Sequence, residues 1–113
     1  EANLVGSIYD PVRNFHMPAI DVDEPLWTLH LIYDAVKNSG RWPQLCIPEA
    51  WREIPSSHEG HFHLYIDIGI TWETYEELLI FMFQIGIIEE KWLKVSRARK
   101  ATYLRLVQDK VVT

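Results

Sequence analysis

Three histidines lie close together in the middle of the chain, at positions 58, 61 and 63. His61 and His63 belong to a segment in which apolar and polar side chains alternate, which predicts a β-strand with both imidazoles on one face. Side chains two residues apart on a strand are separated by about 6.6 Å, a spacing at which two imidazoles can share a metal ion. One expectation is therefore a divalent metal bound by His61 and His63.

A protein metal site needs at least one further ligand. The candidates for that ligand are His58, Glu59, His16 and His30. Asp67 lies about 13 Å along the strand from His63 and is too distant to take part. The alternatives are ordinary histidines of a sheet face, a pH-sensitive contact, or general acid–base catalysis, because imidazole titrates near neutrality. A small metal-dependent or acid–base enzyme is thus one hypothesis, and a protein without any cofactor is the other.

Other chemical motifs are absent from the sequence. It contains no phosphate-binding glycine loop, no dinucleotide fingerprint and no nucleophile–base pattern. The single cysteine, Cys46, cannot form an internal disulfide, and its surroundings predict a small buried apolar residue rather than a reactive thiol. These observations favour a non-enzymatic function.

Positive charge is concentrated near the C-terminus. The first ninety residues contain fifteen acidic and four basic side chains, whereas residues 91–105 contain six basic side chains and no acidic one. The net charge of −5 therefore conceals a locally basic segment, which indicates a binding surface. The residues predicted to bind a partner or nucleic acid are Lys91, Trp92, Lys94, Arg97, Arg99, Lys100 and Arg105.

This basic segment permits three interpretations. Its Lys and Arg side chains could simply protect the edge of a sheet against aggregation. It could bind a protein partner or a second copy of the chain, with Trp92 as an aromatic anchor. It could also contact the phosphates of a nucleic acid, in a manner sensitive to salt, although the acidic remainder of the chain opposes this. The leading hypothesis is a non-enzymatic interaction or regulatory module, and the alternative is a nucleic-acid-binding protein.

The elements that must position these residues predict an α+β domain, with about three helices packed on a three-stranded antiparallel sheet. Helices are expected between an Asp23 cap and a stop at Ser39–Gly40, from Pro48 through Glu53, and from a Thr71 cap to Ile85 with Gly86 beyond it. Strands are expected at 61–68, 87–95 and 101–107, the last two forming a basic hairpin with a loop at 96–100. Residues 1–22 are interpreted as an extended N-terminal arm with at most one short strand near 4–9, and residues 23–113 as a single domain.

The segment from Thr71 to Leu106 also shows a family-like pattern. A helix leads into Phe83-Gln84-Ile85-Gly86-Ile87-Ile88-Glu89, and after the basic loop the chain returns through Tyr103-Leu104-Arg105-Leu106. This pattern resembles the closing half of winged-helix domains, over about a third of the chain. The resemblance implies a winged-helix-like fold and a role in DNA binding or protein docking. A generic α+β domain is the alternative, because Glu73, Glu76 and Glu77 stand where a groove-binding helix should be basic.

Association is expected from the helix at 71–85, which is apolar around most of its circumference. A monomer of this size would leave part of that surface exposed, so the sequence predicts a homodimer or a partner-bound protein. The longest apolar run, 78–88, is shorter than the ~20 residues needed to cross a bilayer. Without a membrane segment, a secretory pattern or a disulfide, the expected location is the cytoplasm.

Overall fold

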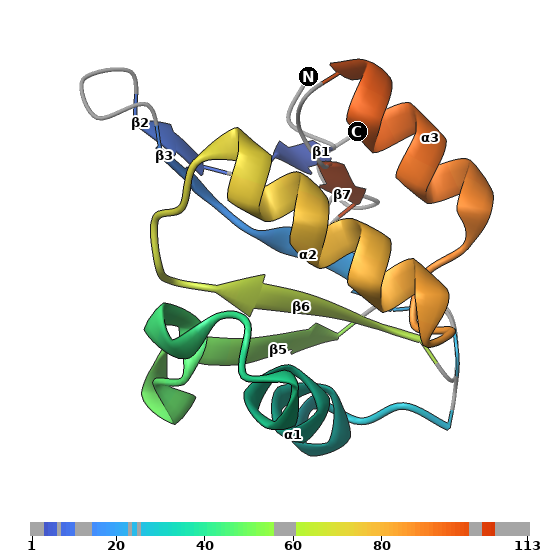
Figure 1. The fold of residues 1–113 in the computed structure, drawn as a ribbon. Coiled ribbons are helices and arrows are strands. Elements are labelled where there is room, and N and C mark those ends of the chain that lie inside the picture. The colour runs from blue at the N-terminus through green and yellow to red at the C-terminus, as the bar shows by residue number, and fades with distance from the viewer. Residues whose placement is uncertain are drawn as a thin grey trace.

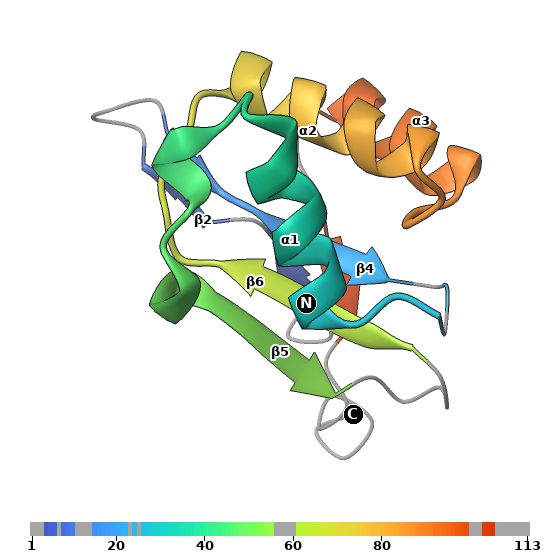
Figure 2. The same ribbon diagram turned by 60° about the horizontal axis from the view of Figure 1, so that its bottom comes forward.

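The computed structural model of the chain describes residues 4–6, 8–10, 15–22, 24, 26–55, 61–99 and 103–105. Its centre is a three-stranded antiparallel sheet in the order β4 (Ala19–Val22), β6 (Phe62–Ile66) and β5 (Trp51–Pro55). Helices α1 (Leu29–Ser39) and α2 (Trp72–Gln84) pack over one face, and α3 (Glu90–Arg99) lies beside α2 (Figures 1 and 2). The predicted α+β class, with three helices and a three-stranded antiparallel sheet, is confirmed.

Alternation along β6 separates the two faces of this sheet. Ile20 pairs with Leu64, and both are fully buried on the face that the helices cover. His63 points to the opposite face, in a row with Asp21 of β4 and Ile54 of β5. The strand predicted at 61–68 is therefore confirmed over 62–66, with its apolar face toward the core.

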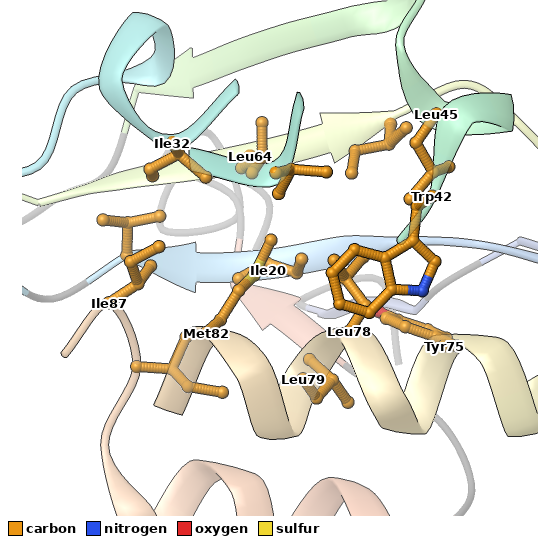
Figure 3. Close-up of a cluster of buried hydrophobic side chains, with 14 of the residues drawn as sticks. Ile20, Ile32, Trp42, Leu45, Leu64, Tyr75, Leu78, Leu79, Met82 and Ile87 are labelled. Carbon is orange, nitrogen blue, oxygen red and sulfur yellow. The ribbon is translucent and has the colours of Figure 1, made fainter. Parts of the chain in front are cut away.

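The core lies between the sheet and helices α1 and α2, and Figure 3 shows side chains from all three meeting in one cluster. Each large apolar side chain buried there contributes about 1.5–3 kcal/mol to folding. The largest fully buried side chains are Tyr75, Ile20, Ile32, Leu45, Leu64, Ile66, Leu78, Leu79, Met82, Ile87 and Val22.

Among the helices in the described ranges, none is long and apolar enough to cross a membrane.

Helix α1 begins later than the sequence predicted. Thr28 is its N-cap, and the Thr28 side-chain oxygen accepts a hydrogen bond from the backbone N–H of Leu31 at 3.2 Å. The predicted cap, Asp23, lies outside the described residues. The predicted end of the helix is confirmed, because Gly40 adopts the left-handed conformation with φ of 71°.

Helix α2 matches its prediction closely. The Thr71 hydroxyl accepts a hydrogen bond from the backbone N–H of Thr74 at 3.3 Å, and Glu73 lies in the first turn, where the helix dipole favours a negative charge. The helix ends before Gly86, whose φ of 87° is accessible to glycine at little cost. Local capping signals therefore fixed both ends of this helix.

The helix predicted from Pro48 through Glu53 is wrong beyond Ala50. Two 3-10 turns, η1 (Pro43–Leu45) and η2 (Pro48–Ala50), precede strand β5. Trp51 is buried, and its indole N–H donates a hydrogen bond to the Leu45 carbonyl at 2.7 Å. The chain extends from this point because β5 pairs with β6 and thereby satisfies its backbone groups.

The hairpin predicted at 87–95 and 101–107 is also wrong. Residues 90–99 form α3, and only Tyr103–Arg105 (β7) is a strand in the described part of the second predicted segment. β7 pairs antiparallel with β1 (Leu4–Gly6) rather than with a neighbour in sequence. Leu93 and Ser96 lie on one side of α3 and are buried, so packing against the domain selects the helix.

The N-terminal segment contains more regular structure than predicted. Besides β1 and β4, it forms β2 (Ile8–Asp10) and β3 (Phe15–Met17), which pair with each other. The expectation of at most one short strand is therefore wrong. The backbones of His16 in β3 and Ile70 also form two hydrogen bonds with each other, with N···O distances of 2.6 and 2.8 Å. Residues 15–22 thus run along 62–70, and these hydrogen bonds integrate the predicted arm into the sheet.

Candidate functional site

Four exposed residues form what we call the outer face of α3. They are Lys91, Lys94, Val95 and Ala98. The helix turns this side to solvent because Leu93 and Ser96, on its other side, are buried. Val95 is 41% exposed, so the outer face combines two ammonium groups with an apolar side chain.

Two of the predicted basic residues are paired with carboxylates of their own chain. The Lys94 ammonium lies 3.3 Å from Glu90, one turn earlier on α3. The Arg97 guanidinium donates a hydrogen bond to Glu76 of α2 at 2.8 Å and thereby ties the two helices together. Part of the predicted positive surface is therefore neutralised within the domain.

The other predicted basic residues are distributed differently. Lys91 is exposed and forms no ion pair with any residue in the described ranges. Arg99 is exposed in the last turn of α3, where the helix dipole favours a cation. Trp92 is half-buried and packs against the core, so little of its ring is offered to a partner. The side chains of Lys100 and Arg105 lie outside the described residues.

His63 lies on the sheet face opposite the helices and is buried. Its Nε2 atom is 3.7 Å from the carboxylate of Asp21, and its Nδ1 atom has no hydrogen-bond partner in the described part of the chain. Burial lowers the pKa of His63, and the negative charge of Asp21 opposes that shift only in part. The imidazole is therefore neutral at neutral pH.

The predicted metal site lacks a ligand set in the described residues. His61 lies just before β6 and is half-buried. His30 is exposed on α1, where it pairs with Asp34 at 3.2 Å, and the segment with His58 and Glu59 is outside the described residues. No group of three or more His, Cys, Asp or Glu residues within the described ranges is placed to hold a metal ion.

His16, the last candidate ligand, lies in an aromatic environment. It is buried in β3, with ring centroids 5.7 Å from Trp72 and 6.2 Å from Tyr75. Burial lowers the pKa of His16, against the opposing charge of Glu73 at the start of α2. These contacts make His16 a packed residue of the junction between β3 and α2.

A small open pocket between α1 and β5 was not predicted from the sequence. It has a volume of about 150 Å³ and is lined by Leu29, His30, Tyr33, Pro48 and Trp51. Sequence periodicity assigned Tyr33 and Trp51 to buried faces and did not indicate that they meet. The pocket could not be predicted because it forms only when residues 51–55 are an extended strand, and a helix was expected there.

The structure brings Lys91 and Lys94 onto one exposed helix face and places His63 in a separate, buried part of the sheet. No protein-family model matches the sequence, and neither the curated proteins nor the solved structures gave a match.

Proposed function

We propose that this chain is a non-enzymatic interaction module that docks a protein partner through the outer face of α3. The observation that carries this proposal is the exposure of Val95 beside Lys91 and Lys94. Protein interfaces combine apolar centres with a charged, solvent-accessible rim, and this helix face offers both at small scale.

The charge distribution supports a partner of acidic character. Residues 1–90 are strongly acidic, so a second protein with many basic groups would be drawn to the body of the domain rather than to α3. An acidic segment that also carries an apolar side chain complements Lys91, Lys94 and Val95 together. Electrostatic attraction of this kind mainly increases the rate of association and its specificity.

The same surface is less suited to nucleic acid. Glu90 lies 3.3 Å from Lys94 and Glu76 lies 2.8 Å from Arg97, so carboxylates stand among the cations. A phosphate backbone that approached these cations would also meet the two carboxylates. A protein carboxylate is smaller and can contact one ammonium group at a time.

The histidines support an enzyme less well than α3 supports docking. His63 is buried, and the carboxylate of Asp21 lies 3.7 Å from its Nε2 atom. General acid–base catalysis requires an imidazole within hydrogen-bond reach of a substrate. Docking requires side chains that a partner can reach, and the exposed residues of α3 meet this requirement without any rearrangement.

A photo-crosslinking amino acid placed at position 95 tests the proposal directly. The expected result is a cross-link to a distinct protein, which is then purified and measured for direct binding. Leu31 of α1 is the matched control position, because its side chain is 47% exposed compared with 41% for Val95. Equal cross-linking from positions 95 and 31 would show that the outer face of α3 has no specific partner.

Charge-removing variants then test the role of the two lysines. Lys91→Ala combined with Lys94→Ala should weaken binding of the purified partner about two- to thirtyfold, since each exposed ion pair contributes about 0.2–1 kcal/mol. Lys37→Ala, which removes an exposed lysine from α1, should leave binding unchanged. If the double variant instead abolishes a salt-sensitive shift of DNA or RNA, the surface binds nucleic acid and the protein-docking proposal is wrong.

A further inference from the structure

The pocket between α1 and β5 has walls made by two aromatic rings. Tyr33 and Trp51 are 5.2 Å apart between ring centroids, and their planes are nearly perpendicular at 89°. Pro48 and Leu29 complete the apolar lining. In Figure 2, α1 lies in front of the sheet beside β5, whereas α3 lies at the far side, so this pocket is distinct from the outer face of α3.

The aromatic walls are fixed in place. The indole N–H of Trp51 donates to the Leu45 carbonyl at 2.7 Å, which holds the ring in one orientation. Tyr33 is half-buried in the middle of α1, and the backbone of that helix is held by its Thr28 cap and by the burial of Ile32 and Val36. A ligand would therefore meet a preformed surface made mainly by the half-buried Tyr33, because Trp51 is only 5% exposed, and a preformed surface lowers the entropic cost of binding.

Two acidic residues adjoin the lining of this pocket. Asp34 follows Tyr33 on α1, and Glu49 follows Pro48 in η2. Burial raises the pKa of the Tyr33 hydroxyl, and nearby Cys46, Glu49 and Asp34 raise it further. His30, which also lines the pocket, lies 3.2 Å from Asp34, and the ammonium group of Lys37 lies one turn beyond Tyr33 on α1.

We propose that this pocket binds a methylated ammonium group, presented either by a modified lysine side chain or by a small quaternary amine. A cation over the face of Trp or Tyr is attracted by the quadrupole of the ring. The ring of Tyr33 and the accessible part of the Trp51 ring, which pack edge to face, can both contact such a group, and the carboxylates of Asp34 and Glu49 add long-range attraction. A volume of about 150 Å³ is sufficient, because a cavity of that size holds benzene, which is larger than a trimethylammonium group.

An NMR titration with choline tests the proposal. The reporter is the indole N–H resonance of Trp51, assigned by its loss in a Trp51→Phe variant. The comparison ligand is 3,3-dimethylbutan-1-ol, which has the shape of choline without its charge. Choline should produce a saturable shift of the Trp51 resonance, and the neutral alcohol should bind at least about fivefold more weakly. Equal binding of the two ligands, or no shift of this resonance with choline, would overturn the proposal.

Three variants separate the contributions of charge and ring. Asp34→Asn combined with Glu49→Gln should weaken choline binding about three- to tenfold and leave binding of the neutral alcohol unchanged. Tyr33→Leu should weaken choline binding by a similar factor, because one aromatic wall is lost. Glu77→Gln, which removes an exposed carboxylate from α2, is the matched control and should leave the choline affinity unchanged. If Glu77→Gln weakens choline binding as much as the pocket variants, the effect is one of net charge and the proposed site is wrong.

A peptide arm distinguishes the two sources of the ammonium group. A short peptide with one trimethyl-lysine and the same peptide with unmodified lysine are titrated against the same Trp51 resonance. Tighter binding of the methylated peptide than of choline identifies a protein side chain as the ligand. Tighter binding of choline identifies a small amine. Tighter binding of the unmodified peptide than of either methylated ligand would contradict a site for methylated ammonium groups.

Discussion

At the scale of single residues, Tyr75 has a role that its sequence position alone does not reveal. Its side chain is fully buried beneath α2, and its hydroxyl accepts a hydrogen bond from the backbone N–H of Ala19 at 2.9 Å. The same hydroxyl donates to the Ala19 carbonyl at 3.2 Å. One side chain therefore satisfies both backbone groups of a residue on the outer strand β4, as a neighbouring strand would.

Replacement of Tyr75 by Phe should therefore destabilise the domain by about 1–3 kcal/mol, because two buried backbone groups lose their partner. Chemical denaturation measures the loss in the free energy of unfolding. Tyr33→Phe is the matched control: it removes the same hydroxyl from a half-buried site and should change stability by less than about 0.5 kcal/mol. A Tyr75→Phe variant as stable as this control would show that solvent replaces the hydroxyl at Ala19.

Residue patterns predicted the candidate site only in part. Alternation correctly predicted that Leu64 and Ile66 face the core and that His63 points to the other face. It did not predict that His63 is buried there, because burial of the second face depends on packing by segments distant in sequence. The exposure of Lys91 and Lys94 was expected from their charge, whereas the pairing of Arg97 with Glu76 requires the contact between α2 and α3.

At the scale of elements, α3 is the main departure from prediction. Leu93 and Val95 are two residues apart, as in an alternating strand, whereas Leu93 and Ser96 are three residues apart, as on one side of a helix. Periodicity alone therefore does not decide between strand and helix for this short segment. Packing against the domain selects the helix. By contrast, α2 was predicted well because Thr71 and Gly86 are strong local signals at its two ends.

The ion pair between Arg97 and Glu76 should make a measurable contribution to the docking of α3 on α2. A double-mutant cycle with Arg97→Ala and Glu76→Ala is expected to give a coupling energy of about 0.5–1 kcal/mol, at the upper end for a partly exposed pair. The comparison cycle uses Lys94 and Glu90, which lie on one helix and should couple by only about 0.3–0.5 kcal/mol. Equal coupling energies in both cycles would mean that the ion pair between α2 and α3 contributes no more to stability than an ion pair within one helix.

At the scale of the whole molecule, two buried histidines make stability depend on pH. His16 of β3 and His63 of β6 both have a pKa lowered by burial from the ordinary value of 6.5, against opposing charges on Glu73 and Asp21 respectively. Above that value both folded and unfolded chains carry neutral imidazoles. Below it the unfolded chain takes up protons first, so the folded state loses stability as the solution becomes more acidic.

The free energy of unfolding should therefore fall between about pH 7.5 and about pH 5.5, with a slope of at most about 1.4 kcal/mol per pH unit for each histidine. Chemical denaturation across this range measures the slope. His16→Gln and His63→Gln should each reduce this slope. A stability that is constant over this range would contradict burial of the two imidazoles in neutral form.

The pairing of β1 with β7 has a consequence for biosynthesis. Leu4 is opposite Arg105 in this ladder, so the partner of the first strand emerges from the ribosome only after the helices and the central sheet have been made. Until then β1 exposes unsatisfied backbone groups that are suited to pairing with other nascent chains. Closure of this ladder is therefore expected to be a late step of folding, and until it is complete the edge of β1 is open to pairing with other chains.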